Sequence, residues 1–261
     1  MAKTLKRIDA VGLQVEALYS KKRRNDTPQQ RAAKQKASSE AQRRMNQIYS
    51  YQKLELLLAT NYPTAGSGLV VTVTFDDKHM PKTREEAQIR FRYFMKKLRT
   101  ARRSAGLPDP VVISTPEILT SVSGRWHYHL VIDNTGNDLN MIRDSWIYGS
   151  DIEAEKLRVD DEKNWETLAR YMTKELRECQ EYDAKPGLHG WSCTRNVKRP
   201  QIDTVTVEDD YELTPPEGST VLLDEKKRTE FASFHILKYR FAHAAARTSA
   251  PRAKRRKRRG F

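Results

Sequence analysis

Hydrophobic residues recur along the chain in two patterns, one typical of strands and the other typical of helices. Alternating or β-branched runs predict strands over residues 69–75, 111–115 (continuing to Glu117), 125–133, 157–159, 203–207, 220–223 and 231–241. A period near 3.6 predicts helices over residues 82–105, 138–147 and 162–182, and good helix formers predict one or two more between 29 and 59. This order indicates an α+β fold in which helices pack on an antiparallel sheet.

Charge is concentrated at the two ends of the chain. Residues 1–60 carry 13 Lys and Arg against 5 Asp and Glu, residues 238–261 carry 10 against none, and residues 61–237 carry 25 against 29. We therefore expect a basic N-terminal helical arm (1–60), a folded domain (61–200), a C-terminal extension of short strands (201–246) and a disordered basic tail (247–261).

Basic ends on a nearly neutral body predict a polyanionic partner, and we expect it to be nucleic acid. The residues expected to contact it are Arg125, Arg252, Lys254, Arg255, Arg256, Lys257, Arg258 and Arg259. A tail that only improves solubility is the alternative interpretation.

Composition excludes several protein classes. The chain has two cysteines and no Cys-x-x-Cys pair, so neither a disulfide framework nor a zinc ribbon is expected. The longest apolar run, Leu69 to Val73, is far shorter than the roughly 20 residues of a membrane span. Residues 1–7 are followed by no apolar stretch of signal-peptide length. We expect a soluble protein of a reducing compartment, the cytoplasm, with no membrane partner.

Candidate metal ligands lie on the predicted strand 125–133. Side chains alternate between the two faces of a strand, so His127 and His129 share one face and an apolar set shares the other. Glu117 ends the preceding strand, ten residues before His127, and a hairpin between the two strands would bring its carboxylate opposite the imidazoles. Two histidines and one carboxylate with open positions opposite are a common site for a catalytic divalent ion. Exposed strand histidines and a solvated carboxylate are the alternative.

A candidate nucleophile lies on the predicted helix 162–182. At about 100° per residue, Tyr171 lies roughly 110° from the centre of the helix's apolar stripe, which is unusual for a tyrosine that only fills the core. Lys174 is three residues away and therefore its neighbour on the helix surface. A nearby cation would make the tyrosine hydroxyl easier to ionise for attack on a phosphodiester. Tyr182 and Lys185 repeat this spacing close to the helix end.

These segments together resemble the motifs of the HUH endonuclease superfamily, the rolling-circle replication initiators. The resemblance rests on Val71–Phe75, on Glu117 with Gly124–Ile132, and on Leu168–Glu175, which contains Tyr171-Met-Thr-Lys174. Trp191–Pro200 is similar to a segment of replication-associated proteins of bacterial phages, plasmids and integrated elements. The match covers roughly residues 50–200.

The resemblance implies a ferredoxin-like or RNA-recognition-like sheet and an enzyme that nicks one DNA strand at an origin. It implies Mg²⁺ or Mn²⁺ held by His127, His129 and Glu117, with Tyr171 forming the covalent 5′ link and Lys174 assisting. Origin DNA in single-stranded form and the cytoplasm of a bacterial host are further implications. No Gly-x-x-x-x-Gly-Lys-Ser/Thr motif occurs, so a separate host helicase and a polymerase are expected.

Two alternatives remain open at this stage. A single-tyrosine transposase would share the same chemistry. A non-catalytic nucleic-acid-binding protein would use the sheet and the basic ends, with His127, His129 and Tyr171 as ordinary structural residues.

Overall fold

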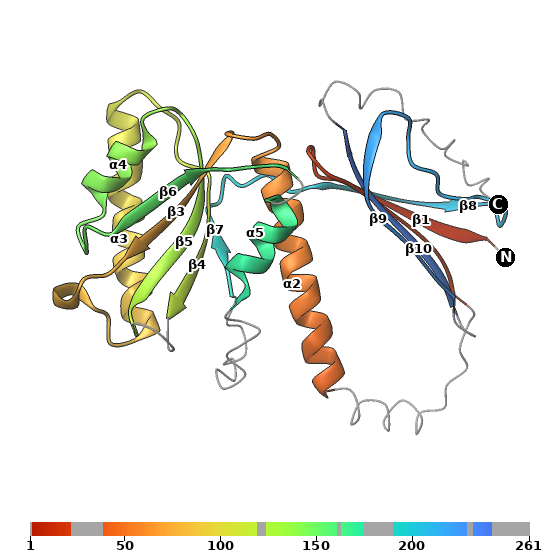
Figure 1. Cartoon of the computed structure of the whole chain (residues 1–261), viewed down its shortest axis with the longest axis horizontal. Helices are drawn as coiled ribbons and strands as arrows, with labels where there is room; N and C mark the ends of the chain where they lie inside the picture. Colours follow the sequence, from red (N-terminus) through yellow and green to blue (C-terminus); the bar gives the residue numbers. More distant parts are fainter. Residues whose placement is uncertain are drawn as a thin grey trace, which may run out of the picture. The chain divides into compact units, whose positions relative to one another are not determined.

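The structure, a computed structural model, describes residues 2–21, 39–118, 124–160, 163–174, 190–228 and 232–241. It confirms the α+β class with antiparallel sheets. The chain divides into two compact units, one made of residues 1–42 with 199–261 and the other of residues 43–198. Each unit contains one five-stranded sheet (Figure 1).

The unit of residues 43–198 holds a sheet with the strand order β6-β3-β5-β4-β7. Its strands are β3 (Gly68–Thr74), β4 (Val112–Ile118), β5 (Trp126–Asp133), β6 (Ile152–Lys156) and β7 (Ser192–Cys193). The helices α3 (Arg84–Ser104) and α4 (Asp138–Ser145) connect them, and a short 3-10 turn, η1 (Asp77–His79), follows β3. The succession β3-α3-β4-β5-α4-β6 is the βαββαβ arrangement of ferredoxin-like folds, as expected.

One face of this sheet is apolar and lies under α3 and α4. Residues from the central strands, among them Val71, Val73, Tyr128 and Leu130, form a single core with the buried side of α3. The helix begins where the Thr83 side chain accepts a hydrogen bond from the Glu86 backbone N–H. The apolar face of β5 is therefore the one predicted from strand alternation, and the histidines face the other side of the sheet.

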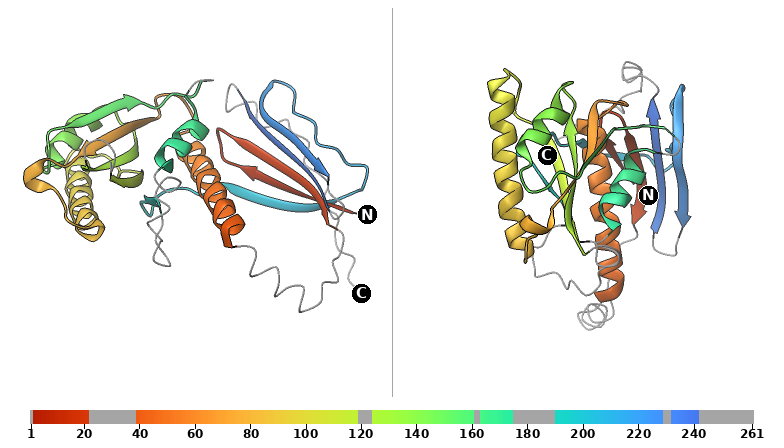
Figure 2. Two further views of the ribbon diagram at one scale, coloured as in Figure 1. Left: turned by 60° about the horizontal axis from the view of Figure 1, so that its bottom comes forward. Right: turned by 60° about the vertical axis from the view of Figure 1, so that its left-hand side comes forward.

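Two further helices, α2 (Ser39–Asn61) and α5 (Trp165–Met172), lie on the side of this sheet that α3 does not cover (Figures 1 and 2). α5 begins at a capping box, in which Asn164 and Thr167 exchange side-chain and backbone hydrogen bonds. The buried Trp165 indole N–H donates to the backbone carbonyl of Tyr62 at 2.9 Å. These contacts fix the start of α5 relative to the end of α2.

The second unit joins the two ends of the chain in one sheet with the order β8-β1-β2-β10-β9. Its strands are β1 (Lys3–Asp9), β2 (Gln14–Lys21), β8 (Gln201–Val207), β9 (Ser219–Arg228) and β10 (Ala232–Phe241). Leu5, Leu18, Leu213, Leu237 and Tyr239 form its core. The strands at 201–207, 219–228 and 232–241 agree with the predicted extension of short strands.

The expected N-terminal helical arm over residues 1–60 is wrong for its first third, because residues 3–9 and 14–21 are strands. The alternation is hidden there because the core-facing side of β1 also carries Arg7, whose guanidinium pairs with Glu16 at 3.2 Å. The expected boundary at 60 is corrected to 42, whereas the one at 200 lies within two residues of the observed boundary at 198. The segments on either side of residues 43–198 belong to one unit.

The predicted strand at 157–159 is also wrong, and the strand in this region is β6, at 152–156. β6 lies at the edge of its sheet and four of its five side chains are exposed, so it lacks the apolar residues that mark a strand. The tail 247–261 and the predicted helical residues 29–38 and 175–182 lie outside the described residues. No helix in the described part of the chain is long and apolar enough to cross a membrane.

Candidate active site

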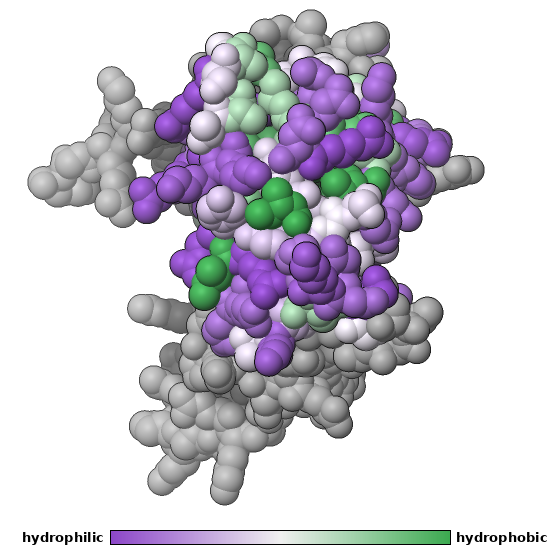
Figure 3. All heavy atoms as spheres, turned by 90° about the vertical axis from the view of Figure 1, so that its left-hand side faces the viewer, coloured by the Kyte–Doolittle hydropathy of each residue, from purple (hydrophilic) through white to green (hydrophobic). Residues whose placement is uncertain are grey.

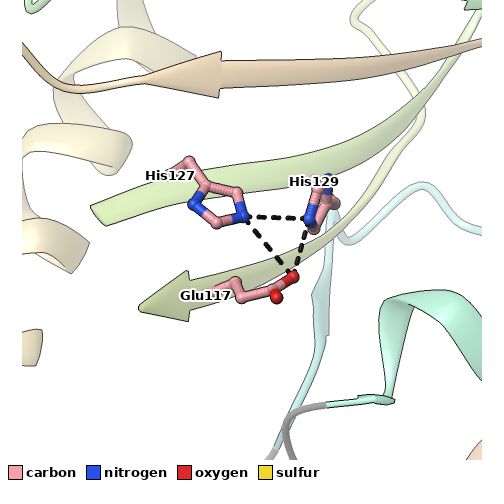
Figure 4. Close-up of side chains that lie close together, drawn as sticks. All are labelled: Glu117, His127 and His129. Carbon is pink, nitrogen blue, oxygen red and sulfur yellow. Dashed lines mark hydrogen bonds and ion pairs between the residues drawn. The ribbon is translucent and has the colours of Figure 1, made fainter. Parts of the chain in front are cut away.

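Strand register brings the three predicted metal ligands together. β4 and β5 pair antiparallel, and this pairing sets Glu117 directly opposite His127 and Thr115 opposite His129. Residues opposite one another or two apart on paired strands project from the same face. Glu117, His127 and His129 therefore converge on the sheet face that α3 does not cover (Figure 4).

The ligand atoms lie at separations suited to a common metal ion. His127 Nε2 and His129 Nε2 are 3.1 Å apart, and Glu117 Oε2 lies 2.7 Å from His129 Nε2 and 3.4 Å from His127 Nε2. Two ligands bound at right angles at about 2.1 Å from an ion would be about 3.0 Å apart. Two imidazoles and one carboxylate also suit first-row divalent metals. The donor set therefore fits a divalent cation.

Hydrogen bonds orient both imidazoles with Nε2 toward the centre of the cluster. His127 Nδ1 lies 3.3 Å from the Arg125 backbone carbonyl, which can only accept, so this contact assigns the proton to Nδ1. His129 Nδ1 lies 3.0 Å from the Thr72 hydroxyl on β3, which can accept in the same way. A metal ion bound at the cluster would replace the Nε2 protons that hydrogen-bond to Glu117, and both Nε2 lone pairs would then bind the ion.

Thr72 is a site residue that sequence reasoning did not identify. It faces His129 because β3 pairs with β5, with Thr72 opposite His129. The predicted strand 69–75 contained Thr72, but its neighbour in the sheet was not evident from the sequence. Alternation within β3 is the signal that could have identified it. Val71 and Val73 face the core, whereas Thr72 and Thr74 are the polar residues between and after them, on the opposite face of the strand.

Burial and hydrogen bonding determine the charge state of the carboxylate. Burial raises the pKa of the Glu117 carboxyl, but hydrogen bonds from His127 and His129 outweigh it and lower the pKa to about 2. His127 and His129 are 5% and 3% exposed, so the alternative of exposed strand histidines does not hold. Glu117 is ionised at neutral pH, as a metal ligand must be.

Tyr171 on α5 lies next to the cluster. Its hydroxyl oxygen is 3.4 Å from His129 Nε2, and the two ring centroids are 4.8 Å apart. The side chain is 50% exposed, so it contacts the cluster and is also open to solvent. The position of Tyr171 away from the apolar stripe of its helix agrees with the sequence prediction, since Trp165, Ala169 and Met172 are the buried residues of α5.

The electrostatic surroundings of Tyr171 differ from the sequence expectation. Burial raises the pKa of its phenol, and the carboxylates of Glu117, Glu153 and Glu155 raise it further. Glu153 lies opposite Thr72 across β6 and β3, and therefore on the same sheet face as the cluster. Lys174 is exposed, two residues beyond the last residue of α5. A cation bound at the cluster would oppose the effect of these carboxylates.

A cation–π contact holds α5 against α2 beside Tyr171. The Arg170 guanidinium lies 4.3 Å from the centre of the Tyr51 ring and donates to the Tyr51 hydroxyl at 3.0 Å. The same guanidinium pairs with Glu166 one turn earlier at 2.7 Å. Because Arg170 precedes Tyr171, these contacts restrict the rotation of the helix that presents the hydroxyl.

The other predicted site residues are less closely connected with the cluster. Arg125 precedes β5 and its guanidinium pairs with Asp77 in η1 at 2.7 Å. The basic residues from Arg252 to Arg259, and Tyr182 with Lys185, lie outside the described residues.

Comparisons with protein-family models, with curated proteins and with solved structures find no match for this chain. Its function must therefore be inferred from the residues and the geometry described above.

Proposed function

We propose that this chain is a metal-dependent, tyrosine-type endonuclease and strand transferase of the HUH class, which nicks single-stranded origin DNA and initiates rolling-circle replication. The observation that carries the proposal is the distance of 3.4 Å between the Tyr171 hydroxyl and His129 Nε2. It supports the proposal because a solvent-accessible tyrosine hydroxyl lies beside three side chains that could hold a metal ion together. A phosphodiester bound there would contact both at once.

In this reaction the Tyr171 oxygen forms a bond to the scissile phosphorus as the bond to the 3′ oxygen breaks. The phenol proton passes to water as the Tyr171 oxygen attacks, since this side chain is open to solvent, and the departing 3′ oxygen takes a proton from water to become a 3′-OH. The 5′ phosphate stays on Tyr171, and the 3′-OH is available to a polymerase. Glu117, His127 and His129 would hold Mg²⁺ or Mn²⁺, which supplies positive charge at the phosphate oxygens when bound.

The remaining residues of the site would position these groups. Thr72 and the Arg125 carbonyl would keep the two imidazoles in place, and Arg170 with Tyr51 would orient α5. Lys174 would assist near the phosphate. The excess of basic residues at both ends supports DNA as the partner, and the absence of a nucleotide-binding motif in the sequence supports a separate helicase.

The proposal is tested by incubating the full chain with labelled single-stranded DNA from its own replicon, in Mn²⁺ or in EDTA, and resolving covalent adducts on denaturing gels. We expect an adduct in Mn²⁺ and none in EDTA. Tyr171→Phe should abolish the adduct. Tyr93→Phe is the matched control, because Tyr93 is similarly exposed, at 48%, but lies on α3, across the sheet from the cluster.

An adduct that persists in Tyr171→Phe would contradict the assignment of the nucleophile. An adduct in EDTA would contradict the metal requirement. If no adduct forms with Mg²⁺ or Mn²⁺ while salt-sensitive binding is retained, the protein is instead a nucleic-acid-binding protein without nuclease activity. Direct titration of Mn²⁺ provides a second measurement, and His127→Ala should weaken Mn²⁺ binding.

A further inference from the structure

The outer surface of α3 is far from the candidate active site. Its buried residues, among them Phe91, Phe94 and Leu98, pack on the apolar face of the sheet, whereas the metal ligands occupy the other face. The sheet and the whole width of α3, about 10–12 Å, therefore separate its outer surface from Tyr171. DNA held at the active site would not also cover this surface.

Four basic residues follow one line along this outer surface. Arg92, Lys96, Arg99 and Arg103 are spaced by four, three and four residues, which places them within about 60° of one another around the helix axis. We call these residues the α3 basic stripe. At a rise of 1.5 Å per residue it extends for about 16 Å. The side of the molecule that carries α3 and α4 is largely hydrophilic, with only small separate hydrophobic areas (Figure 3).

Few carboxylates oppose the charge of the α3 basic stripe. Within the described residues, Arg92, Lys96 and Arg99 take part in no ion pair. Arg103 forms a two-point ion pair with Asp109, at 2.7 Å for each contact, and its side chain still remains 68% exposed. The acidic residues of α3 are confined to its first turn. Among the described residues, Asp109 is thus the one carboxylate that forms an ion pair with the stripe, and the four basic side chains keep a net positive charge.

The pattern fits a duplex DNA backbone better than a single strand. Single-strand binding relies on aromatic side chains that stack on successive bases, but the outer surface of α3 offers one aromatic residue, Tyr93, beside Ile89. Cations at regular intervals on a rigid helix instead match a regular row of phosphates. Such contacts position DNA without reading its sequence.

We infer that the α3 basic stripe binds the phosphate backbone of a duplex DNA segment, separate from the strand that reaches Tyr171. The stripe would hold double-stranded DNA that flanks the cleaved site while the opposite sheet face acts on the single strand. Binding of a duplex at the stripe is inferred from α3 alone and does not require the nuclease activity, whereas the position of that duplex beside the cleaved site rests on the proposed function.

The test measures binding of a labelled duplex by the full chain carrying Tyr171→Phe, in EDTA, over a range of salt concentrations. Each phosphate contact contributes about 0.9 to the slope of log K against log salt concentration. The triple variant Arg92→Gln, Lys96→Gln, Arg99→Gln should reduce the magnitude of that slope by about 2–3. A control variant, Lys226→Gln, Lys227→Gln, Arg228→Gln, removes the same charge from exposed positions of β9 and should leave the slope unchanged.

Equal losses in both triple variants would overturn the inference, because net charge alone would then account for binding. A loss seen with single-stranded but not with duplex DNA would also overturn it. A second measurement uses unsubstituted stripe residues: saturating duplex should protect Lys96 from an amine-acetylating reagent, while Lys226 stays reactive. If Lys96 stays as reactive as Lys226, duplex DNA does not bind at the stripe. Because these measurements use EDTA and Tyr171→Phe, their outcome is independent of the nuclease proposal.

Discussion

At the scale of single residues, the candidate site depends on hydroxyl and carbonyl groups that are not themselves metal ligands. Thr72 contacts the ring nitrogen of His129 that points away from the cluster, and the Arg125 carbonyl does the same for His127. Groups in such positions fix the tautomer and the orientation of an imidazole ligand. The Thr72 contact can be removed with little change in side-chain volume.

We predict that Thr72→Val weakens Mn²⁺ binding by about 10–100-fold, because the orientation of His129 is no longer fixed. Calorimetric titration of Mn²⁺ into the full chain measures the effect. Thr74→Val is the control, since Thr74 lies on the same strand and the same face, opposite His127, and should leave Mn²⁺ affinity nearly unchanged. Equal effects of the two substitutions would show that the Thr72 hydroxyl has no specific role.

The sequence alone predicted that the three candidate metal ligands lie close together, but it did not predict the residues that hold them in position. His127 and His129 share a face because of strand alternation, and Glu117 could be paired with them because β4 and β5 are consecutive. Thr72 reaches His129 from β3, which is separated from β5 in sequence by α3 and β4. Local patterns do not encode which distant strands become neighbours. The carboxylates that raise the pKa of Tyr171 come partly from β6, for the same reason.

At the scale of secondary-structure elements, the short helix α5 depends on tertiary contacts for its position. It has eight described residues, a length that is marginal for an isolated helix, and it presents Tyr171 to the cluster. Its position depends on the capping box at Asn164, on the Trp165 indole and on the Arg170 contact with Tyr51. The loss of one of these contacts should change the position of Tyr171.

We predict that Asn164→Ala destabilises the protein by about 1 kcal/mol and lowers the rate of adduct formation at Tyr171. Thr83→Ala is the control, because it removes the equivalent cap of α3 at similar cost but leaves α5 intact. Urea unfolding measures stability, and single-turnover adduct formation measures the rate. If both variants lower the rate equally, the effect reflects global stability and not the placement of Tyr171.

Elements with strong apolar periodicity were predictable, and elements defined by tertiary pairing were not. The predicted strands at 69–75 and 125–133 and the predicted helix at 82–105 correspond to β3, β5 and α3 within two residues at each end. β1 was missed because its inward face mixes Leu5 with charged Arg7, so the alternation is broken. Such a strand forms because its neighbours supply both hydrogen bonds and an opposite charge.

At the scale of the whole molecule, one unit is continuous in sequence and the other is not. Residues 43–198 form one compact unit, whereas the other takes its strands from residues 3–21 and 201–241. β1 pairs with β8, and β2 pairs with β10, across about 200 residues of sequence. Leu5, fully buried on β1, belongs to the same core as Leu237 on β10.

We predict that Leu5→Ala destabilises this sheet by about 2–5 kcal/mol, because it leaves a cavity among buried residues. Hydrogen exchange followed by mass spectrometry should show faster exchange in β8 and β10 as well as in β1, because their pairing is mutual. Leu223→Ala is the control, since Leu223 on β9 is 39% exposed. Faster exchange confined to β1 would contradict the cooperative sheet.

The pairing of the first strands with the last ones has a consequence during synthesis on the ribosome. β1 and β2 emerge early, but a two-stranded hairpin is only marginally stable without further strands. At about 5–20 residues per second, roughly 10–40 s pass before β8 emerges. All strands of the other unit are available before then. We therefore expect residues 43–198, the unit that contains His127 and His129, to fold first. During that time the outer edges of β1 and β2 stay unpaired and open to chaperones or to neighbouring chains.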